Sequence, residues 1–358
     1  MNTPADIIAR EVEKNGVLPF ARFMELALYC PLYGYYEKEG DRIGRRGDFI
    51  TSASIGSLFG ELLAFQFAGW IEAGGGHEIV ESGAHDGRLA ADILGWLRLR
   101  RPTLLERIAY HIVEPSAARR ARQENLLREF GDAVRWHSNL ESLPAAGMDG
   151  VVFGNELLDA MPVRRFGWDA SAGQWFEWGV AIEQGRFAWR RCPGSAADPP
   201  DLPADVLECL PDGYIWETSP AAERWWSAAA AKLRRGRLLA VDYGFTLEER
   251  LAPERREGTL RAYRAHRVSA DVLADPGEQD LTAHVDFTAI RRAGETAGLR
   301  TDAWSGQDAF LVRIAERAWS DPERFGPWDS ARTRQFQSLT HPDHLGRAFR
   351  VLIQSRGI

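Results

Sequence analysis

The chain has 358 residues, of which 45% are hydrophobic and 27% are charged, as is usual for a folded globular protein. Its net charge of −7 argues against a dedicated nucleic-acid binder, because phosphate recognition draws most of its affinity from Lys and Arg. No apolar run approaches the roughly 20 residues that cross a bilayer, and the acidic N-terminal segment is unlike a targeting peptide. We therefore expect a cytoplasmic protein without membrane insertion.

Residues 1–76 are expected to form a helical extension. Thr3 and Asp6 have the spacing of a capping box, which marks the start of a helix. Apolar residues at helical spacing predict further helices, so that the three predicted helices cover residues 3–14, 19–29 and 53–73. The segment 31–50 is rich in Gly and charge and predicts a long surface loop.

Short apolar runs alternate with helical stretches from residue 77 onward, as in a parallel sheet that is covered by helices. Five strands are predicted, at residues 78–80, 108–113, 133–137, 150–154 and 237–243. A helix over 287–297 and a late strand over 310–314 follow them. The sequence thus predicts a Rossmann-like α/β core over residues 77–162 and 236–358.

Residues 163–235, between the fourth and fifth strands, are expected to be an insertion. Within them, residues 163–191 alternate apolar and polar side chains around Gly-containing turns, which predicts antiparallel strands. The Pro-rich segment 192–205 is the best linker candidate. The predicted architecture is therefore a Rossmann-like core with an N-terminal helical extension and an inserted antiparallel β segment.

Glycines and acids follow the first two core strands. The first strand turns into a helix through ESGAHDG, which supplies the candidate cofactor ligands Glu81, Gly83, Ala84 and Gly87. Glycines at such a turn allow close backbone approach to a ligand, and an acid at the next strand end, here Glu114, can accept the hydroxyls of an adenosine ribose. An ordinary tight turn explains the glycines equally well, and Glu114 could instead cap the following helix.

Polar side chains also end the next three strands. Asn139 and Leu140 follow the third strand, where an adenine ring could lie, although an ordinary loop is the stronger explanation there. The same edge should carry the acids and amide that end the fourth and fifth strands, namely Asn155, Glu156, Asp159 and Asp242. Such groups could hold the methionine portion of a cofactor and orient a cationic nucleophile. Alternatively, Asp159 could cap a turn.

Other chemistries find less support in the sequence. The three cysteines lie far apart and the HPDH run at 341–344 lacks a third ligand, so no metal site is expected. Methyl transfer needs no metal, because the sulfonium of S-adenosylmethionine is already activated and the protein has only to align the acceptor. A nicotinamide-dependent dehydrogenase would share the turn and the ribose acid, but the full GxGxxG is missing.

Several longer motifs resemble the MidA-like family of S-adenosylmethionine-dependent methyltransferases. The matching runs are PLYGYY at 31–36, GDFITS at 47–52, LFGELLA at 58–64, NELLDAMPV at 155–163, GTLRAYRAHRV at 258–268, DPGEQDLTAHVDFTAI at 275–290 and LGRAFRVLI at 345–353. They span nearly the whole chain in the expected order. The resemblance implies the class I methyltransferase fold and S-adenosylmethionine as the cofactor.

The resemblance also implies residue roles and a partner. Thr51 and Ser52 are expected beside the reactive methyl, Gly83 and Glu114 at the cofactor, and Asn155, Glu156 and Asp159 in the lining of the active site. Mitochondrial members of the family are complex I assembly factors that methylate an arginine of a partner subunit. A protein substrate is therefore implied, and the acids Glu156 and Asp159 would clamp its guanidinium in a fork.

Two departures from the family pattern bear on activity. His85 stands where the first glycine loop usually has a further Gly, and TSAS stands in place of TSPE, so that Ala53 and Ser54 replace Pro and Glu. The alternative hypothesis is therefore a methyltransferase-like scaffold that binds a partner protein without catalysis.

Overall fold

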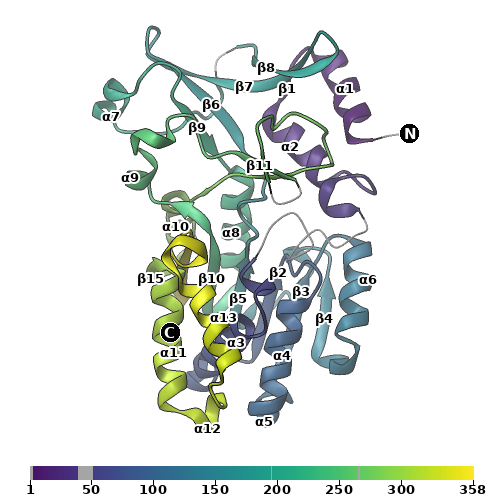
Figure 1. The fold of residues 1–358 in the computed structure, drawn as a ribbon, viewed down its shortest axis with the longest axis vertical. Helices are drawn as coiled ribbons and strands as arrows, with labels where there is room; N and C mark the ends of the chain where they lie inside the picture. The colour runs from purple at the N-terminus through teal and green to yellow at the C-terminus, as the bar shows by residue number, and fades with distance from the viewer. Residues whose placement is uncertain (1–2, 39–50, 195, 265–266) are drawn as a thin grey trace.

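The computed structural model describes residues 3–38, 51–194, 196–264 and 267–358. These residues form a helix-covered sheet, in the lower half of Figure 1, and a second unit of smaller sheets and N-terminal helices above it. Among the helices of the described residues, none is long and apolar enough to cross a membrane.

The central sheet has eight strands, of which seven follow the order β4-β3-β2-β5-β10-β16-β15, while β14 pairs with β10. Its strands are β2 (Glu78–Ser82), β3 (Ala109–Val113), β4 (Val134–His137), β5 (Met148–Asn155), β10 (Leu233–Phe245), β14 (Val285–Asp286), β15 (Arg300–Gly306) and β16 (Phe349–Arg356). Strand β16 runs antiparallel to both of its neighbours, β10 and β15, and the other strands of the sheet run parallel to one another. The strand order reverses between β2 and β5, and ligands of open α/β sheets bind at such a point, beyond the carboxyl ends of the strands.

Helices cover both faces of this sheet. Ile79 packs into the apolar cluster on one face and the next residue, Val80, into the cluster on the other, which is why the strands read as continuous apolar runs. The first face carries α3 (Leu58–Trp70), α4 (Arg88–Arg100), α11 (Gln307–Ser320), α12 (Pro322–Phe325) and α13 (Ser330–Thr340). The second face carries α8 (Pro220–Lys232) and α10 (Phe287–Thr296). Two further helices, α5 (Pro102–Leu105) and α6 (Ala117–Leu126), flank β3 in sequence.

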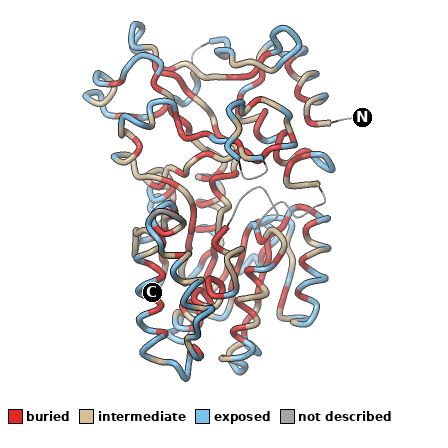
Figure 2. The backbone as a smooth tube through the Cα atoms, viewed as in Figure 1, coloured by how far each residue is buried: buried red, intermediate tan, exposed pale blue. Residues whose placement is uncertain are grey.

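The upper unit joins distant parts of the chain around two smaller sheets. A five-stranded antiparallel sheet contains β1 (Leu18–Pro19), β6 (Arg164–Asp169), β7 (Gln174–Glu183), β8 (Arg186–Arg191) and β9 (Ile215–Thr218). A three-stranded sheet contains β11 (Arg261–Arg264), β12 (Arg267–Ser269) and β13 (Asp280–Thr282). The helices of this unit are α1 (Pro4–Asn15), α2 (Phe20–Tyr29), α7 (Ala204–Cys209) and α9 (Leu247–Arg250). Figure 2 shows buried residues in both units; two apolar clusters lie on the faces of the central sheet and two more lie in the upper unit.

Several predicted elements agree with the structure and several do not. The capping box of Thr3 and Asp6 forms, and the inserted strands are antiparallel. The strand predicted over 310–314 is wrong, because these residues lie within α11. Phe310, Leu311 and Ile314 have helical spacing and pack on the sheet from outside it.

The predicted domain boundaries also need correction. Helix α8 was expected in the insertion, but it belongs with the core, because Ala222 and Trp226 pack with Leu238 of β10 and Leu352 of β16. Conversely, the strands β11 and β13 were expected in the core but pack with the N-terminal helices of the upper unit. The predicted linker 192–205 contributes the buried Leu202 to the core of the inserted sheet.

The N-terminal extension differs in two details. The helix predicted over 53–73 begins only at Leu58, after a short 3-10 turn over Ser52–Ser54. In the predicted loop 31–50, Tyr35–Glu37 form another 3-10 turn in which Tyr35 is fully buried. The rest of that loop, 39–50, lies outside the described residues.

Candidate active site

A cavity of about 1130 Å³ lies where the carboxyl ends of the central strands meet the upper unit. Ten of the predicted site residues line it: Thr51, Glu81, Gly83, Ala84, Glu114, Asn139, Leu140, Asn155, Glu156 and Asp159. Ser52, Gly87 and Asp242 do not line it. The cavity is larger than the roughly 300–1,000 Å³ of a typical small-molecule pocket, so it has room for a cofactor and part of a second reactant.

The glycine loop between β2 and α4 bends sharply at the cavity wall. Gly83 has a φ of +73°, and a Cβ built there would lie 2.8 Å from Cδ1 of Leu157, so no other residue fits without a shift. His85 has a φ of +47°, a left-handed conformation that explains why a glycine is usual at that place. Gly87 is the N-cap residue of α4, and a Cβ built there would meet Gln123 instead of the cavity.

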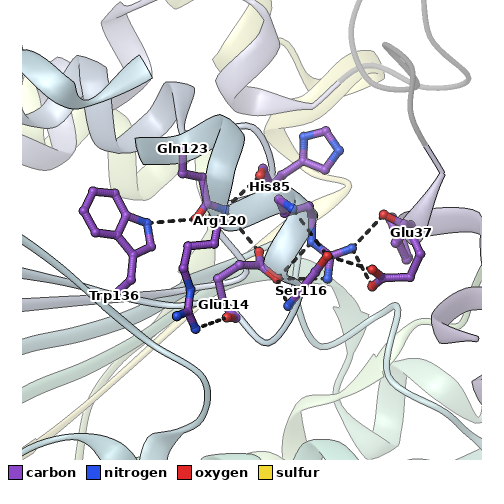
Figure 3. A network of polar contacts seen from close by, with 9 residues as sticks. Glu37, His85, Glu114, Ser116, Arg120, Gln123 and Trp136 are labelled. Carbon is purple, nitrogen blue, oxygen red and sulfur yellow. Dashed lines mark hydrogen bonds and ion pairs between the residues drawn. The ribbon is translucent and has the colours of Figure 1, made fainter. Parts of the chain in front are cut away.

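Glu114, at the end of β3, is held in a polar network, and its side chain is only 1% exposed. Its Oε1 accepts the backbone N–H of Ser116 at 2.9 Å and Nε–H of Arg119 at 3.0 Å. Its Oε2 accepts one bond, from Nε2 of Gln123 at 3.1 Å (Figure 3). Since a carboxylate oxygen has two lone pairs, Oε2 retains an acceptor position for a ribose hydroxyl.

The N-terminal extension closes over the same network. Nη1 of Arg119 donates to the carbonyl oxygen of Tyr36 at 2.7 Å, and the hydroxyl of Ser116 donates to Oε2 of Glu37 at 2.7 Å. Tyr36 lines the cavity, and its hydroxyl donates to Oδ1 of Asp280 at 2.8 Å. The upper unit thus forms the wall opposite the central sheet.

Asn139 and Leu140 lie at the end of the cavity where α8 approaches the sheet. Oδ1 of Asn139 accepts the N–H of Ser142 at 2.9 Å, so this side chain caps a short turn instead of pointing to a ligand. Leu140 and Trp225 line the cavity there and give it an apolar surface that suits a flat ring.

Glu156 and Asp159 form an acidic group at the base of the cavity. Glu156 has a φ of +52°, and its Oε1 accepts the N–H of Ser52 at 3.1 Å and Nδ2–H of Asn155 at 3.0 Å. Burial, with the nearby Asp242 carboxylate, raises the pKa of Glu156 to about 8. Burial, together with the carboxylates of Asp242 and Asp280, raises the pKa of Asp159 well above its usual range.

Asp242 was predicted to be catalytic, and the structure places it behind the cavity wall. It is fully buried, and its Oδ2 accepts the backbone N–H groups of Leu157, Leu158 and Asp159 at 3.1, 2.7 and 3.4 Å. Its Oδ1 accepts the N–H of Tyr243 at 2.8 Å. Burial raises the pKa of Asp242 to about 7 in spite of these bonds. Asp242 therefore shapes the loop that carries the acids instead of meeting a ligand.

Ser52 was predicted to lie beside the reactive methyl, but its side chain is turned away from the cavity. Its hydroxyl donates to Oε1 of Gln307 at 2.9 Å in the fully buried interior, and only its backbone N–H reaches Glu156. Thr51, the residue before it, lines the cavity.

The cavity residues suit S-adenosylmethionine. Oγ of Ser82 and Oδ1 of Asn155 are buried there and have no hydrogen-bond partner among the described residues, so both can receive polar groups of a methionine portion. Glu81 adds a carboxyl whose pKa burial raises to about 7 and which accepts the hydroxyl of Tyr110 at 2.7 Å.

Sequence reasoning missed the half of the cavity that the upper unit supplies. Among the missed lining residues of that unit are Tyr29, Tyr36, Tyr263, Asp280 and His284. Tyr36 and Asp280 stand in the motifs PLYGYY and DPGEQDLTAHVDFTAI, which carried the family resemblance. The motifs were therefore the one sequence signal for these lining residues, although nothing in the motifs predicts that their side chains face the cavity.

A parallel sheet in which the C-terminal strand β16 lies antiparallel between β10 and β15, a glycine loop after β2 and an acid after β3 are the features expected of a Rossmann-like, S-adenosylmethionine-dependent methyltransferase. A family model described as "Putative S-adenosyl-L-methionine-dependent methyltransferase" matches residues 62–304, more than half of the chain. The chain belongs to this family.

Named relatives agree with that assignment. The chain is 29% identical to the mitochondrial protein arginine methyltransferase NDUFAF7 homolog of Drosophila melanogaster, over 97% of this chain and 84% of the relative. It is 30% identical to the mitochondrial protein arginine methyltransferase NDUFAF7 of Mus musculus, over 80% of this chain and 68% of the relative. The expectation of a cytoplasmic protein is contradicted by these relatives, which are named as mitochondrial, and is not retained.

A crystal structure from Burkholderia thailandensis, of a methyltransferase candidate bound to S-adenosyl-homocysteine, is similar over nearly its whole length. The TM-score is 0.85 and the identity 34%, over 99% of this chain and 92% of that one. The ligand-free structure from the same organism has a TM-score of 0.83. S-adenosylmethionine is accordingly the cofactor of this chain.

Proposed function

We propose that this methyltransferase transfers the methyl group of S-adenosylmethionine to a guanidinium nitrogen of an arginine in a partner protein. The observation that carries the proposal is the group of three carboxyl side chains, Glu156, Asp159 and Asp280, which share one cavity with the cofactor loops. The names of the relatives, protein arginine methyltransferases, support the same acceptor.

The acidic group is suited to a cation. Burial, together with the carboxylates of Asp242 and Asp280, raises the pKa of both Glu156 and Asp159. A guanidinium between them would stabilise their ionised forms and would bond each carboxylate through its planar N–H groups. A neutral acceptor would not stabilise the ionised carboxylates.

The residues of the chain would divide the work as follows. Oε1 of Glu156 is held by Ser52 and Asn155, which leaves Oε2 to accept an N–H of the guanidinium. When bound, S-adenosylmethionine supplies an activated methyl group. As the nitrogen takes the methyl group, it loses a proton, and the ionised carboxylate of Glu156 is the group placed to accept it.

The replacement of Pro and Glu by Ala53 and Ser54 does not leave the site without acids. The hydroxyl of Ser54 donates to the carbonyl oxygen of Thr51 at 2.8 Å, and the hydroxyl of Thr51 accepts the N–H of Ser54 at 3.1 Å, so this pair closes a turn. Asp280, which enters from the upper unit, also supplies a carboxyl group to the cavity. This supports an active enzyme over a scaffold without catalysis.

The family resemblance gives the first acceptor to test, a subunit of respiratory complex I. The chain would then act in the assembly of that complex, which is the role that the family resemblance gives to the mitochondrial members.

The test is methyl transfer from labelled S-adenosylmethionine to proteins of a cell extract that lacks this chain, followed by mass spectrometry of the labelled peptides. We expect label on arginine, lost in Glu156→Gln. The matched control is Glu183→Gln, which removes an exposed carboxylate of β7 paired with Arg190 and should leave transfer unchanged. Label on another residue type, or equal transfer by Glu156→Gln, would contradict the proposal.

A further inference from the structure

Gln123 of α6 connects the two predicted cofactor elements. It is fully buried and makes three bonds (Figure 3). Its Nε2 donates to the carbonyl oxygen of His85 at 2.9 Å and to Oε2 of Glu114 at 3.1 Å. Its Oε1 accepts the indole N–H of Trp136, on β4, at 3.1 Å.

Trp136 determines which way the amide of Gln123 points. An indole N–H can only donate, so it must face the oxygen of the amide. Both protons of Nε2 are then directed to His85 and Glu114, which both accept. A reversed amide would place its NH₂ against the indole N–H and its oxygen against two acceptors.

This bond pattern fixes two features that a cofactor would meet. The carbonyl of His85 belongs to the turn with a φ of +47°, which a non-glycine residue adopts only when its surroundings hold it there. The carboxylate of Glu114 gains a third donor besides Ser116 and Arg119. The donation from Gln123 also fixes which lone pair of Oε2 remains for a ribose hydroxyl.

We propose that Gln123, oriented by Trp136, is a positioning residue that sets the affinity of the enzyme for the ribose of its cofactor. It acts through Glu114. Its bond to the carbonyl of His85 also holds the left-handed turn at this residue, where the family usually has a glycine. The inference rests on the proposed role of Glu114 as the ribose acceptor and does not depend on the identity of the methyl acceptor.

The chain contains a matched pair of the same chemistry away from the cavity. The indole N–H of Trp226 donates to Oε1 of Gln354 at 2.7 Å, and Nε2 of Gln354 donates to the carbonyl of Arg291 at 2.9 Å and to Oγ1 of Thr301 at 3.0 Å. Neither Trp226 nor Gln354 lines the cavity. Variants of this pair lose the same bonds without touching the cofactor elements.

The experiment compares three ligands by isothermal titration: S-adenosylhomocysteine and its 2′-deoxy and 3′-deoxy analogues. They are titrated into the wild type, Gln123→Met and Trp136→Phe, with Gln354→Met and Trp226→Phe as controls. Thermal unfolding verifies that each variant is folded. Trp136→Phe keeps the aromatic ring and serves if Gln123→Met does not fold.

We expect the wild type to bind at least one deoxy analogue at least about tenfold more weakly than S-adenosylhomocysteine, because that analogue lacks a hydrogen bond to a charged group. Gln123→Met should weaken S-adenosylhomocysteine by a similar factor but that deoxy analogue much less, so that the preference for the hydroxyl largely disappears. Trp136→Phe should act in the same direction, and the control variants should retain the full preference.

Two results would overturn the proposal, and they differ. Equal loss of affinity for all three ligands in Gln123→Met, or no loss, would show that Gln123 does not act through Glu114. Equal binding of all three ligands by the wild type would show instead that Glu114 is not the ribose acceptor. Neither result bears on whether arginine is the methyl acceptor.

Discussion

The raised pKa of Glu156 predicts that a guanidinium ligand binds more tightly as the pH rises. The probe is Nα-acetyl-arginine methylamide, titrated into the enzyme that is saturated with S-adenosylhomocysteine. Its guanidinium stays charged over the whole range, because its pKa lies above about 12. Any change in affinity between pH 6 and pH 9 therefore reports on the protein.

The size of the effect follows from the ionised fraction of Glu156. With a pKa of about 8 in the free site, roughly 1% of this carboxyl is ionised at pH 6 and roughly 90% at pH 9. If only the ionised form binds the cation, the affinity should rise about ninetyfold over this interval. The raised pKa of Asp159 acts in the same direction.

Isothermal titration at four or five pH values measures this rise and should also detect proton release on binding. Glu156→Gln should lose the part of the rise that Glu156 causes and keep only a smaller rise from Asp159, whereas Glu183→Gln should follow the wild type. The citrulline analogue of the probe is neutral and should bind weakly at every pH. A flat profile for the wild type, or an unchanged profile in Glu156→Gln, would refute the electrostatic reasoning.

Three further outcomes are expected. Gly83→Ala should weaken S-adenosylhomocysteine in a titration, because alanine is strained at a φ of +73° and its Cβ would displace the side chain of Leu157; an unchanged affinity would argue that the shape of this turn does not matter for binding. Asp242→Ala should lower the free energy of unfolding in urea by at least about 1–3 kcal/mol, since four backbone N–H groups lose their acceptor; a loss near zero would contradict this. The unliganded protein should become less stable as the pH rises from about 7 to about 8, because folded Glu156 and Glu81 keep protons that the unfolded chain releases; stability that rises over this range would contradict the pKa directions.

The sequence predicted the half of the cavity that the central sheet builds. Parallel strands of a Rossmann-like sheet end at one edge, so residues directly after them, such as Gly83, Glu114 and Glu156, had to come close together. The same rule misplaced Asp242. A strand end places a residue at the edge, but it does not tell whether the side chain meets a ligand or, as here, the N–H groups of the neighbouring loop.

The other half of the cavity depends on how the upper unit sits on the sheet. Tyr36 and Asp280 are far apart in the sequence, and their hydrogen bond forms only because the N-terminal extension and β13 pack in one apolar cluster. No local pattern encodes that packing. The misassigned strand at 310–314 has a different cause, because a short apolar run suits a buried strand and a helix face alike.

The most direct test of the account is a crystal structure with S-adenosylhomocysteine and Nα-acetyl-arginine methylamide bound together. The account predicts the ribose beside Glu114 and the guanidinium between Glu156 and Asp159, with its nearest nitrogen facing the sulfur of the cofactor. A guanidinium bound elsewhere, or a ribose away from Glu114, would contradict it.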